Sequence, residues 1–295
     1  SFRILDLYAG QGGSFLDSAN KYASWVPGFQ GGESERLTGQ WMKQRRNRQN
    51  MFITSKVGFP YGDIPRSLKK EIIISECEKS LERLGVETID LYFAHAFDAG
   101  TPAEESMEAF FRLKKEGKIR FAGASNFYGW QVAEANEAAG GREWEGFVCI
   151  QQRHTYLEPA LRSKFGSQVL LTPEIHAFCM KKGLAIMAYS PLLGGAYVSD
   201  ERPVPVQYQS VTGEFRMAAL KEVAGDLGVS PNAVILAWMM QDEPGIIPIV
   251  TGSSAGQLEE NLQALQISLS REHLELLTRE VDGDIPFGAN SLKTR

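Results

Sequence analysis

The sequence has 295 residues, a formal net charge of −5 at pH 7, 43% hydrophobic residues and 23% charged residues. This balance is typical of a globular protein with a large core, the acidic charge argues against a nucleic-acid binder, and no apolar run reaches the ~18 residues of a membrane span. The cysteines Cys77, Cys149 and Cys179 are too scattered for a disulfide framework or a zinc site. We therefore expect a cytoplasmic protein without a bound metal.

The first residues show neither an initiator methionine nor the pattern of a signal peptide. The segment after Ser1 reads as part of a helix. We therefore expect that the natural chain starts earlier.

From residue 14 onward, short apolar segments alternate with longer amphipathic ones. The apolar segments predict seven strands, at residues 14–17, 51–57, 88–95, 121–125, 147–152, 184–190 and 246–251. Helix starts are predicted at Pro65, Thr101, Thr172 and Ser230, because a capping residue or proline precedes an amphipathic run there. This alternation indicates a parallel sheet with right-handed crossovers.

Two architectures fit this alternation: an open doubly wound sheet and a closed (β/α)8 barrel. The open sheet would carry a glycine fingerprint after its first strand, but the glycine-rich run at residues 10–13 precedes its strand and lacks the third glycine. In a barrel the C-terminal strand ends meet at one mouth, where active sites lie. Polar residues stand at or just after these ends: Asp17, Lys56, His95, Asn126, Gln151, Ser190 and Ser253.

We therefore predict one (β/α)8 (TIM) barrel domain over residues 1–295, with the first strand absent from this chain. Two long irregular stretches, residues 23–32 and 197–212, are expected to face substrate or cofactor.

Four residues could form a proton-transfer group at this mouth. Tyr22 follows Asp17 by five positions, and a phenol has an ordinary pKa of ~10. The ammonium of Lys56 would favour the phenolate, and Asp17 would hold that ammonium in place. His95 could orient or polarise a carbonyl oxygen. Each residue alone is weak evidence, whereas the four together suggest proton transfer to a carbonyl.

Seven ordered segments make nearly the whole chain resemble the aldo-keto reductases, in the branch of aryl-alcohol dehydrogenases and channel β subunits. They lie at residues 12–22, 32–35, 52–57, 89–95, 117–127, 188–192 and 252–261. The resemblance implies an NAD(P)H-dependent oxidoreductase that reversibly reduces aldehydes or ketones to alcohols. It implies Tyr22 as the general acid, with Lys56 and Asp17 tuning it, and His95 as the residue that positions the carbonyl.

The resemblance also implies an extended nicotinamide dinucleotide across the barrel mouth, usually NADPH. NADH is the alternative, because no Lys or Arg stands between Thr251 and Asn261; Arg202 is a candidate for the missing charge. The matching positions are Ser125, Asn126 and Gln151 for the carboxamide, Tyr189 for stacking on the ring, Ser190, Pro191, Leu192 and Gly194 for the pyrophosphate, and Gly252, Ser254, Gln257, Glu260 and Asn261 for the adenosine side. Asp17 is also expected at the cofactor. Gln151, not Gln152, should point into the barrel, because strand side chains alternate.

The substrate is expected to be a small carbonyl compound or alcohol, in a partly aromatic pocket. Its candidate residues are Trp25, Phe29, Phe59, Phe97 and Phe127. Two other functions stay open: a cofactor-binding regulatory subunit with little turnover, and a barrel isomerase or aldolase that uses Lys56 as a Schiff base. The sequence names neither the substrate nor the oligomeric state.

Overall fold

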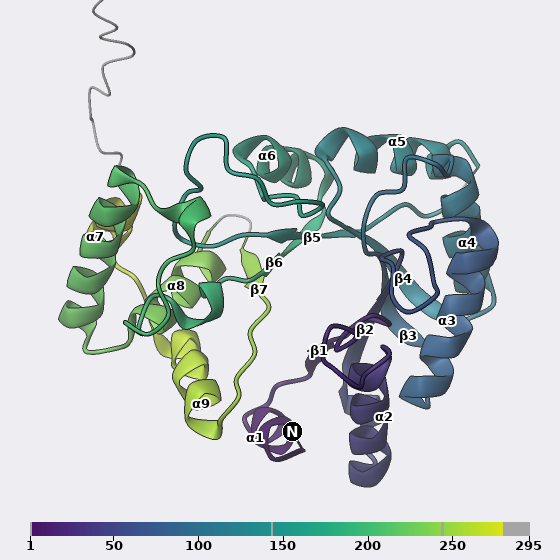
Figure 1. Cartoon of the computed structure of the whole chain (residues 1–295), viewed down its shortest axis with the longest axis horizontal. Helices are drawn as coiled ribbons and strands as arrows, with labels where there is room; N and C mark the ends of the chain where they lie inside the picture. Colours follow the sequence, from purple (N-terminus) through teal and green to yellow (C-terminus); the bar gives the residue numbers. More distant parts are fainter. Residues whose placement is uncertain (1, 143, 243–244, 280–295) are drawn as a thin grey trace, which may run out of the picture.

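The structure is a computed structural model that describes residues 2–142, 144–242 and 245–279. Parallel strands form one curled sheet, with helices on its outer face (Figure 1). The strands are β1 Phe15–Asp17, β2 Phe52–Val57, β3 Ile89–Ala94, β4 Ile119–Ser125, β5 Cys149–Arg153, β6 Ala185–Tyr189 and β7 Ile246–Pro248. Each predicted strand is therefore confirmed, with bounds within three residues of those expected.

The strands pair in chain order, which brings their C-terminal ends to one side. Lys56 lies opposite Phe93, and Ser125 opposite Gln151. In the part of the chain that the structure describes, β1 and β7 each pair with one neighbour only, so the sheet stays open between them. This is a (β/α)8 barrel that lacks one strand, as predicted.

The helices follow the strands as crossovers. They are α1 Phe2–Gly10, α2 Glu33–Arg45, α3 Lys70–Leu84, α4 Ala103–Lys115, α5 Gly129–Gly140, α6 Pro173–Lys182, α7 Val211–Leu227, α8 Pro231–Met240, α9 Ala255–Gln263 and α10 Arg271–Thr278. The hydroxyls of Thr172 and Ser230 cap α6 and α8 as expected, by accepting from the Ile175 and Ala233 N–H groups at 3.2 Å.

One predicted helix start is wrong: α3 begins at Lys70 and not at Pro65. The Leu68 N–H donates to Asp98 Oδ2 at 2.9 Å, and the Leu68 carbonyl accepts from Ser106 Oγ at 2.9 Å. These bonds to the loop after β3 and to α4 hold the segment outside the helix.

The irregular stretch predicted to reach residue 212 ends earlier. Ser210 caps α7, because its Oγ accepts from the Gly213 N–H at 3.0 Å. The loop before it packs against the segment after β5: the Leu157 N–H donates to Tyr197 Oη at 3.1 Å, and Tyr208 is buried.

A small cluster of apolar residues fills the barrel interior below its C-terminal end. Leu91, Phe93, Cys149 and Met187 are buried together there. The larger part of the core lies between the sheet and the helices. The polar strand ends therefore lie directly above this buried apolar cluster, which we call the apolar floor.

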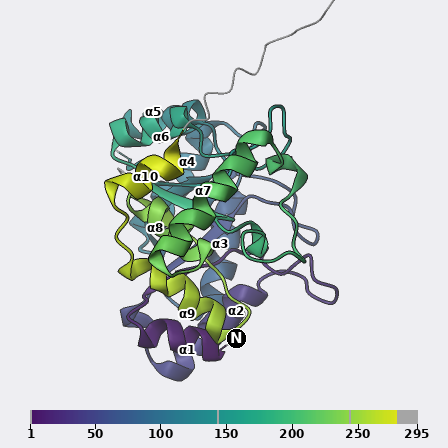
Figure 2. The same cartoon turned by 90° about the vertical axis from the view of Figure 1, so that its left-hand side faces the viewer.

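At the open side, α1 packs against α9 (Figures 1 and 2). Among the described residues no single helix is long and apolar enough to cross a membrane; only α7 and α8 together meet such a test, and they meet at an angle of 97°.

Candidate active site

Lys56 is the centre of the cluster at the C-terminal ends of β1 and β2. Its Nζ donates to Asp17 Oδ2 at 2.6 Å, to the Ser18 carbonyl at 2.8 Å and to Tyr22 Oη at 2.9 Å. The side chain has no solvent exposure. Three acceptors for its three N–H bonds hold Lys56 as an ammonium. Burial lowers its pKa, and the charge and hydrogen bond of Asp17 and the charge of Glu35 oppose that effect.

The Asp17 carboxylate is held by four donors. Its Oδ2 accepts from Lys56 and, at 3.3 Å, from Tyr22 Oη. Its Oδ1 accepts from Thr54 Oγ1 at 2.6 Å and from Gln151 Nε2 at 3.0 Å. Asp17 therefore joins three strands, and Gln151 points into the barrel, as the strand alternation indicates.

The structure corrects the expectation that Lys56 makes Tyr22 acidic. Burial and the Asp17 carboxylate raise the pKa of Tyr22 well above its ordinary value. The Lys56 ammonium, whose Nζ donates to Tyr22 Oη at 2.9 Å, does not outweigh these two effects. Tyr22 is therefore a neutral phenol at neutral pH, which suits a proton donor.

His95 lies beside this phenol. The two ring centroids are 5.9 Å apart, and the Phe59 ring lies edge-on to His95 at 4.7 Å. Burial and the positive charges of Lys56 and Lys21 lower the pKa of His95 well below its ordinary value. A neutral imidazole at this place can donate a hydrogen bond to a carbonyl oxygen.

The segment that carries Tyr22 is fixed by hydrogen bonds to the buried carboxylate of Glu76 on α3. Asn20 Nδ2 donates to Glu76 Oε2 at 2.9 Å, and the Tyr61 hydroxyl donates to the same oxygen. Gly31 has φ 101°, and a Cβ there would lie 2.5 Å from the Tyr61 ring, so only glycine fits. Our sequence analysis missed Glu76; its place on the buried face of a predicted helix was the available signal.

The residues expected at the carboxamide lie together at the ends of β4 to β6. Asn126 has φ 59°; its Nδ2 donates to the His95 carbonyl at 2.9 Å, and its Oδ1 accepts from Tyr189 Oη at 2.7 Å. Its N–H donates to Gln152 Oε1 at 2.8 Å, so Gln152 holds the backbone while Gln151 faces the interior.

Arg153 was not among the predicted site residues. Its Nε donates to Tyr208 Oη at 3.0 Å, and its Nη1 lies 3.4 Å from Ser190 Oγ. Across the described ranges, no carboxylate lies within ion-pair distance of this guanidinium. Arg202, by contrast, donates to the Gly194 carbonyl at 2.6 Å, and the Pro191 carbonyl accepts from a threonine.

The adenosine-side residues lie at the start of α9. Ser254 Oγ accepts from the Gln257 N–H at 3.3 Å, which makes it the N-cap of this helix. Glu260 accepts from Asn232 Nδ2 at 3.4 Å, and Asn261 is buried. A surface recess at this helix start is lined by Arg3, Ile4, Ser253, Ser254, Ala255 and Gly256.

Arg3 therefore stands beside the predicted adenosine-side segment, which has no Lys or Arg between Thr251 and Asn261. It belongs to α1, which packs against α9, and its side chain is exposed. Sequence analysis could not find it, because Arg3 and Ser254 lie at opposite ends of the chain.

The aromatic candidates lie in three places. Phe59 lies against His95, and the Trp25 ring lies 6.1 Å from that of Tyr22. Phe127, by contrast, is 3% exposed and packs against the core, and Phe97 lies edge-on to it at 5.5 Å. Phe29 is 50% exposed.

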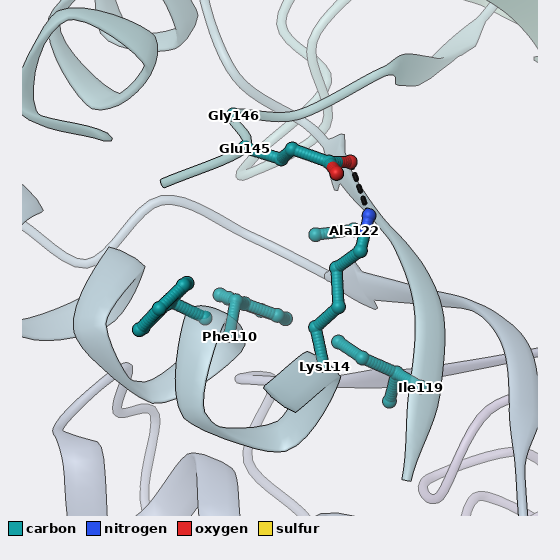
Figure 3. Close-up of a pocket in the computed structure, with 7 residues that line it drawn as sticks. Phe110, Lys114, Ile119, Ala122, Glu145 and Gly146 are labelled. Carbon is teal, nitrogen blue, oxygen red and sulfur yellow. Dashed lines mark hydrogen bonds and ion pairs between the residues drawn. The ribbon is translucent and has the colours of Figure 1, made fainter. Parts of the chain in front are cut away.

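A small pocket elsewhere does not belong to this site. It lies between α4, the start of β4 and the segment before β5, and the Lys114–Glu145 ion pair closes it (Figure 3). Phe110, Ile119 and Ala122 also line it. These are the N-terminal ends of the strands, opposite the end that carries Asp17 and Lys56.

Comparison with known proteins identifies the class. The model of the aldo/keto reductase family matches residues 1–281. An uncharacterised oxidoreductase of Bacillus subtilis is 30% identical, over 94% of this chain and 85% of its own. An aryl-alcohol dehydrogenase of Pestalotiopsis microspora is 28% identical, over 97% of this chain and 74% of its own.

The fold gives the same answer. The crystal structure of a thermostable aldo-keto reductase with the inhibitor epalrestat matches with a TM-score of 0.73 and 27% identity, over 94% of this chain and 85% of that chain. The chain belongs to the aldo/keto reductase family. It is an oxidoreductase that reduces carbonyl compounds to alcohols with a nicotinamide cofactor.

Proposed function

We propose that this chain is an NADPH-dependent reductase of aryl aldehydes or ketones in which Tyr22 is the proton donor. The observation that carries the proposal is the neutral Tyr22 phenol, whose Oη accepts from Lys56 Nζ at 2.9 Å and which lies beside the His95 ring. When bound, the nicotinamide supplies the hydride.

Each residue of the group has a separate task in this proposal. His95 donates a hydrogen bond that orients the carbonyl oxygen, and Tyr22 gives its proton to that oxygen. The Lys56 ammonium stabilises the phenolate that remains, and Asp17 holds the ammonium in place. The apolar floor excludes water below them.

The nicotinamide end of the cofactor fits the polar groups between β4 and β6. We propose that Ser125, Asn126 and Gln151 hold the carboxamide next to Asp17, and that Tyr189 stacks on the ring. The Ser190 to Leu192 loop with Gly194, together with Arg153, would bind the pyrophosphate. Arg153 supports this fit because it is a cation that lies beside Ser190 and, in the described residues, has no carboxylate partner.

The adenosine end fits Gly252, Ser254, Gln257, Glu260 and Asn261 at the start of α9. The N–H groups of a helix start favour a phosphate. Arg3 lines the same recess and would pair with the additional phosphate of NADPH. We therefore propose a preference for NADPH over NADH, with Arg3 in the place that we had considered for Arg202.

For the substrate, we propose an aryl carbonyl compound with Phe59 and Trp25 as walls of its pocket. Their contacts with His95 and Tyr22 support this proposal, and Phe29, Phe97 and Phe127 stay candidates for a more distant wall. The names of the aryl-alcohol dehydrogenase relatives support the same class. We further propose one domain over residues 1–295. We also propose a cytoplasmic location, supported by the buried free thiols of the three cysteines.

The Schiff-base alternative conflicts with the geometry of Lys56. A nucleophilic amine needs a free electron pair, whereas Lys56 Nζ donates to three acceptors and its side chain is fully buried.

The test is a fluorescence titration with NADPH and with NADH, followed by a panel of carbonyl compounds monitored at the nicotinamide absorbance. We expect tighter binding of NADPH and rapid oxidation of it by aryl aldehydes. Tight binding without oxidation of bound NADPH would instead identify a regulatory subunit, and borohydride trapping of substrate on Lys56 would identify an aldolase.

A further inference from the structure

Two cations contact the Phe59 ring at the substrate end of the site. Lys21 Nζ lies 4.5 Å from the ring centroid, and Arg66 Cζ lies 5.0 Å from it. The same ring lies edge-on to His95 at 4.7 Å. Lys21 directly precedes Tyr22, so positive charge gathers next to the residues that would handle the carbonyl oxygen.

Neither cation forms a salt bridge with any residue that the structure describes. The carboxylate of Asp98 feels the charge of Arg66, which helps to lower its pKa, but its oxygens accept from the Leu68 N–H at 2.9 Å and from Thr101 Oγ1 at 2.6 Å. Burial and the charge of Arg66 lower the pKa of Lys21. Two like charges are thus held close together without an acid between them, and a bound anion would relieve their repulsion.

The cofactor does not account for these charges. In the proposed binding mode its phosphates lie along β6, β7 and α9, where Arg153 and Arg3 are available. Lys21 and Arg66 stand on different segments, those that follow β1 and β2. An anion bound between these two side chains would therefore belong to the substrate.

We propose that Lys21 and Arg66 bind an anionic group of the substrate, so that this enzyme prefers aryl carbonyl compounds that carry a carboxylate or a phosphate away from the reacting carbon. The Phe59 ring, which both cations contact, would give the aromatic part of such a substrate an apolar edge. This inference rests on the proposed function and names its substrate class.

The test compares three benzaldehydes that differ only at the position opposite the aldehyde: 4-carboxybenzaldehyde, 4-formylphenyl phosphate and the neutral methyl 4-formylbenzoate. With saturating NADPH, we expect kcat/KM for one anion to exceed that for the ester by about tenfold, mainly through KM. The anion with the larger increase in kcat/KM shows whether the site prefers a carboxylate or a phosphate. Because the cations are partly exposed, added salt should reduce the preference.

Variants assign the preference to the two side chains. Arg66→Met and Lys21→Met should each lower the ratio of anion to ester by about fivefold. Lys43→Met, on the exposed part of α2, is the matched control and should leave the ratio as in the wild type. Arg66 is exposed, so its replacement tests the idea even if the Lys21 variant does not fold.

Binding of terephthalate, followed by protein fluorescence, separates this inference from the proposed function. Terephthalate needs no turnover, and Arg66→Met should weaken its binding about fivefold. Turnover of the ester with no preference for either anion would overturn the inference and keep the function. Binding of terephthalate that depends on Arg66, without turnover of any aldehyde, would keep the anion site and overturn the function.

Discussion

The two ends of the barrel mouth are built in different ways. At the β1 to β3 end, Asp17, Tyr22 and Lys56 bond directly to one another, and Lys56 is fully buried. At the β7 end, the proposed adenosine site consists of the start of α9 and the exposed Arg3 from the opposite end of the chain.

This difference separates chemistry from affinity. Proton transfer needs groups fixed within fractions of an ångström, and buried side-chain bonds provide that accuracy. A phosphate can be bound by backbone N–H groups and a mobile cation, which need less accuracy. Substitutions at the first end should therefore change turnover, and those at the second should change cofactor affinity.

The largest effect should come from Tyr22→Phe. This change removes the proton donor and keeps the ring, so kcat should fall by about 10²- to 10⁴-fold. Steady-state kinetics with an aryl aldehyde measure this loss. Fluorescence titration should give an NADPH Kd close to that of the wild type. Turnover within a few-fold of normal would contradict the role of Tyr22.

Lys56→Met should have the next largest effect. It leaves the buried Asp17 carboxylate without its counter-ion, which typically costs about 3–5 kcal/mol of unfolding free energy. Urea denaturation measures this loss, and turnover should fall with it because the phenolate is no longer stabilised.

The double variant Asp17→Asn with Lys56→Met is the control for that experiment. It removes both charges, so much of the stability should return while turnover stays low. If the double variant is as unstable as Lys56→Met alone, the unpaired charge of Asp17 is not the cause of the lost stability.

Most of the catalytic group of Asp17, Tyr22, Lys56 and His95 could be predicted from the sequence. Asp17, Lys56 and His95 end consecutive strands, and parallel pairing in chain order brings such ends together without further information. The phenol was placed correctly beside Lys56, but its pKa direction was not. That direction depends on burial and on the distance from Asp17, which no sequence pattern supplies.

The supporting residues could not be predicted, because their partners are distant in the chain. Glu76 is buried against Asn20, which lies 56 positions away, and Arg3 meets the start of α9 only because the open sheet brings α1 beside it. The start of α3 was misplaced for the same reason, since the Leu68 N–H bonds to Asp98 and not within a helix.

A third prediction uses the pH dependence of stability. His95 has a folded-state pKa well below its ordinary value of about 6.5, so below pH 6.5 the unfolded chain binds a proton that the folded site does not. The contribution of neutral His95 to the free energy of unfolding is therefore present above pH 6.5 and is lost as pH falls below that value. Between pH 6.5 and 5.5 the loss should be about 1 kcal/mol.

His95→Asn should remove this part of the pH slope. Burial lowers the pKa of His154 to about 4, so His154 also makes the protein less stable as pH falls. Because wild type and variant share His154, the difference between their pH slopes reports His95 alone. Urea denaturation at the two pH values measures the difference. Equal slopes would show that His95 titrates normally in the folded protein.

The smallest effect should come from Arg3→Ala at the opposite end of the mouth. An exposed ion pair typically contributes up to about 1 kcal/mol, so the Kd for NADPH should rise about three- to fivefold. The Kd for NADH should not change, because NADH lacks the additional phosphate. Fluorescence titration at low salt measures both.

Arg202→Ala is the matched control, because Arg202 was the other candidate for this charge and donates to the Gly194 carbonyl. If Arg202→Ala selectively weakens NADPH binding while Arg3→Ala does not, the additional phosphate lies over the loop after β6 and not at the start of α9. In that case the loop that follows Tyr189, and not the start of α9, would be the part of the mouth that sets cofactor affinity.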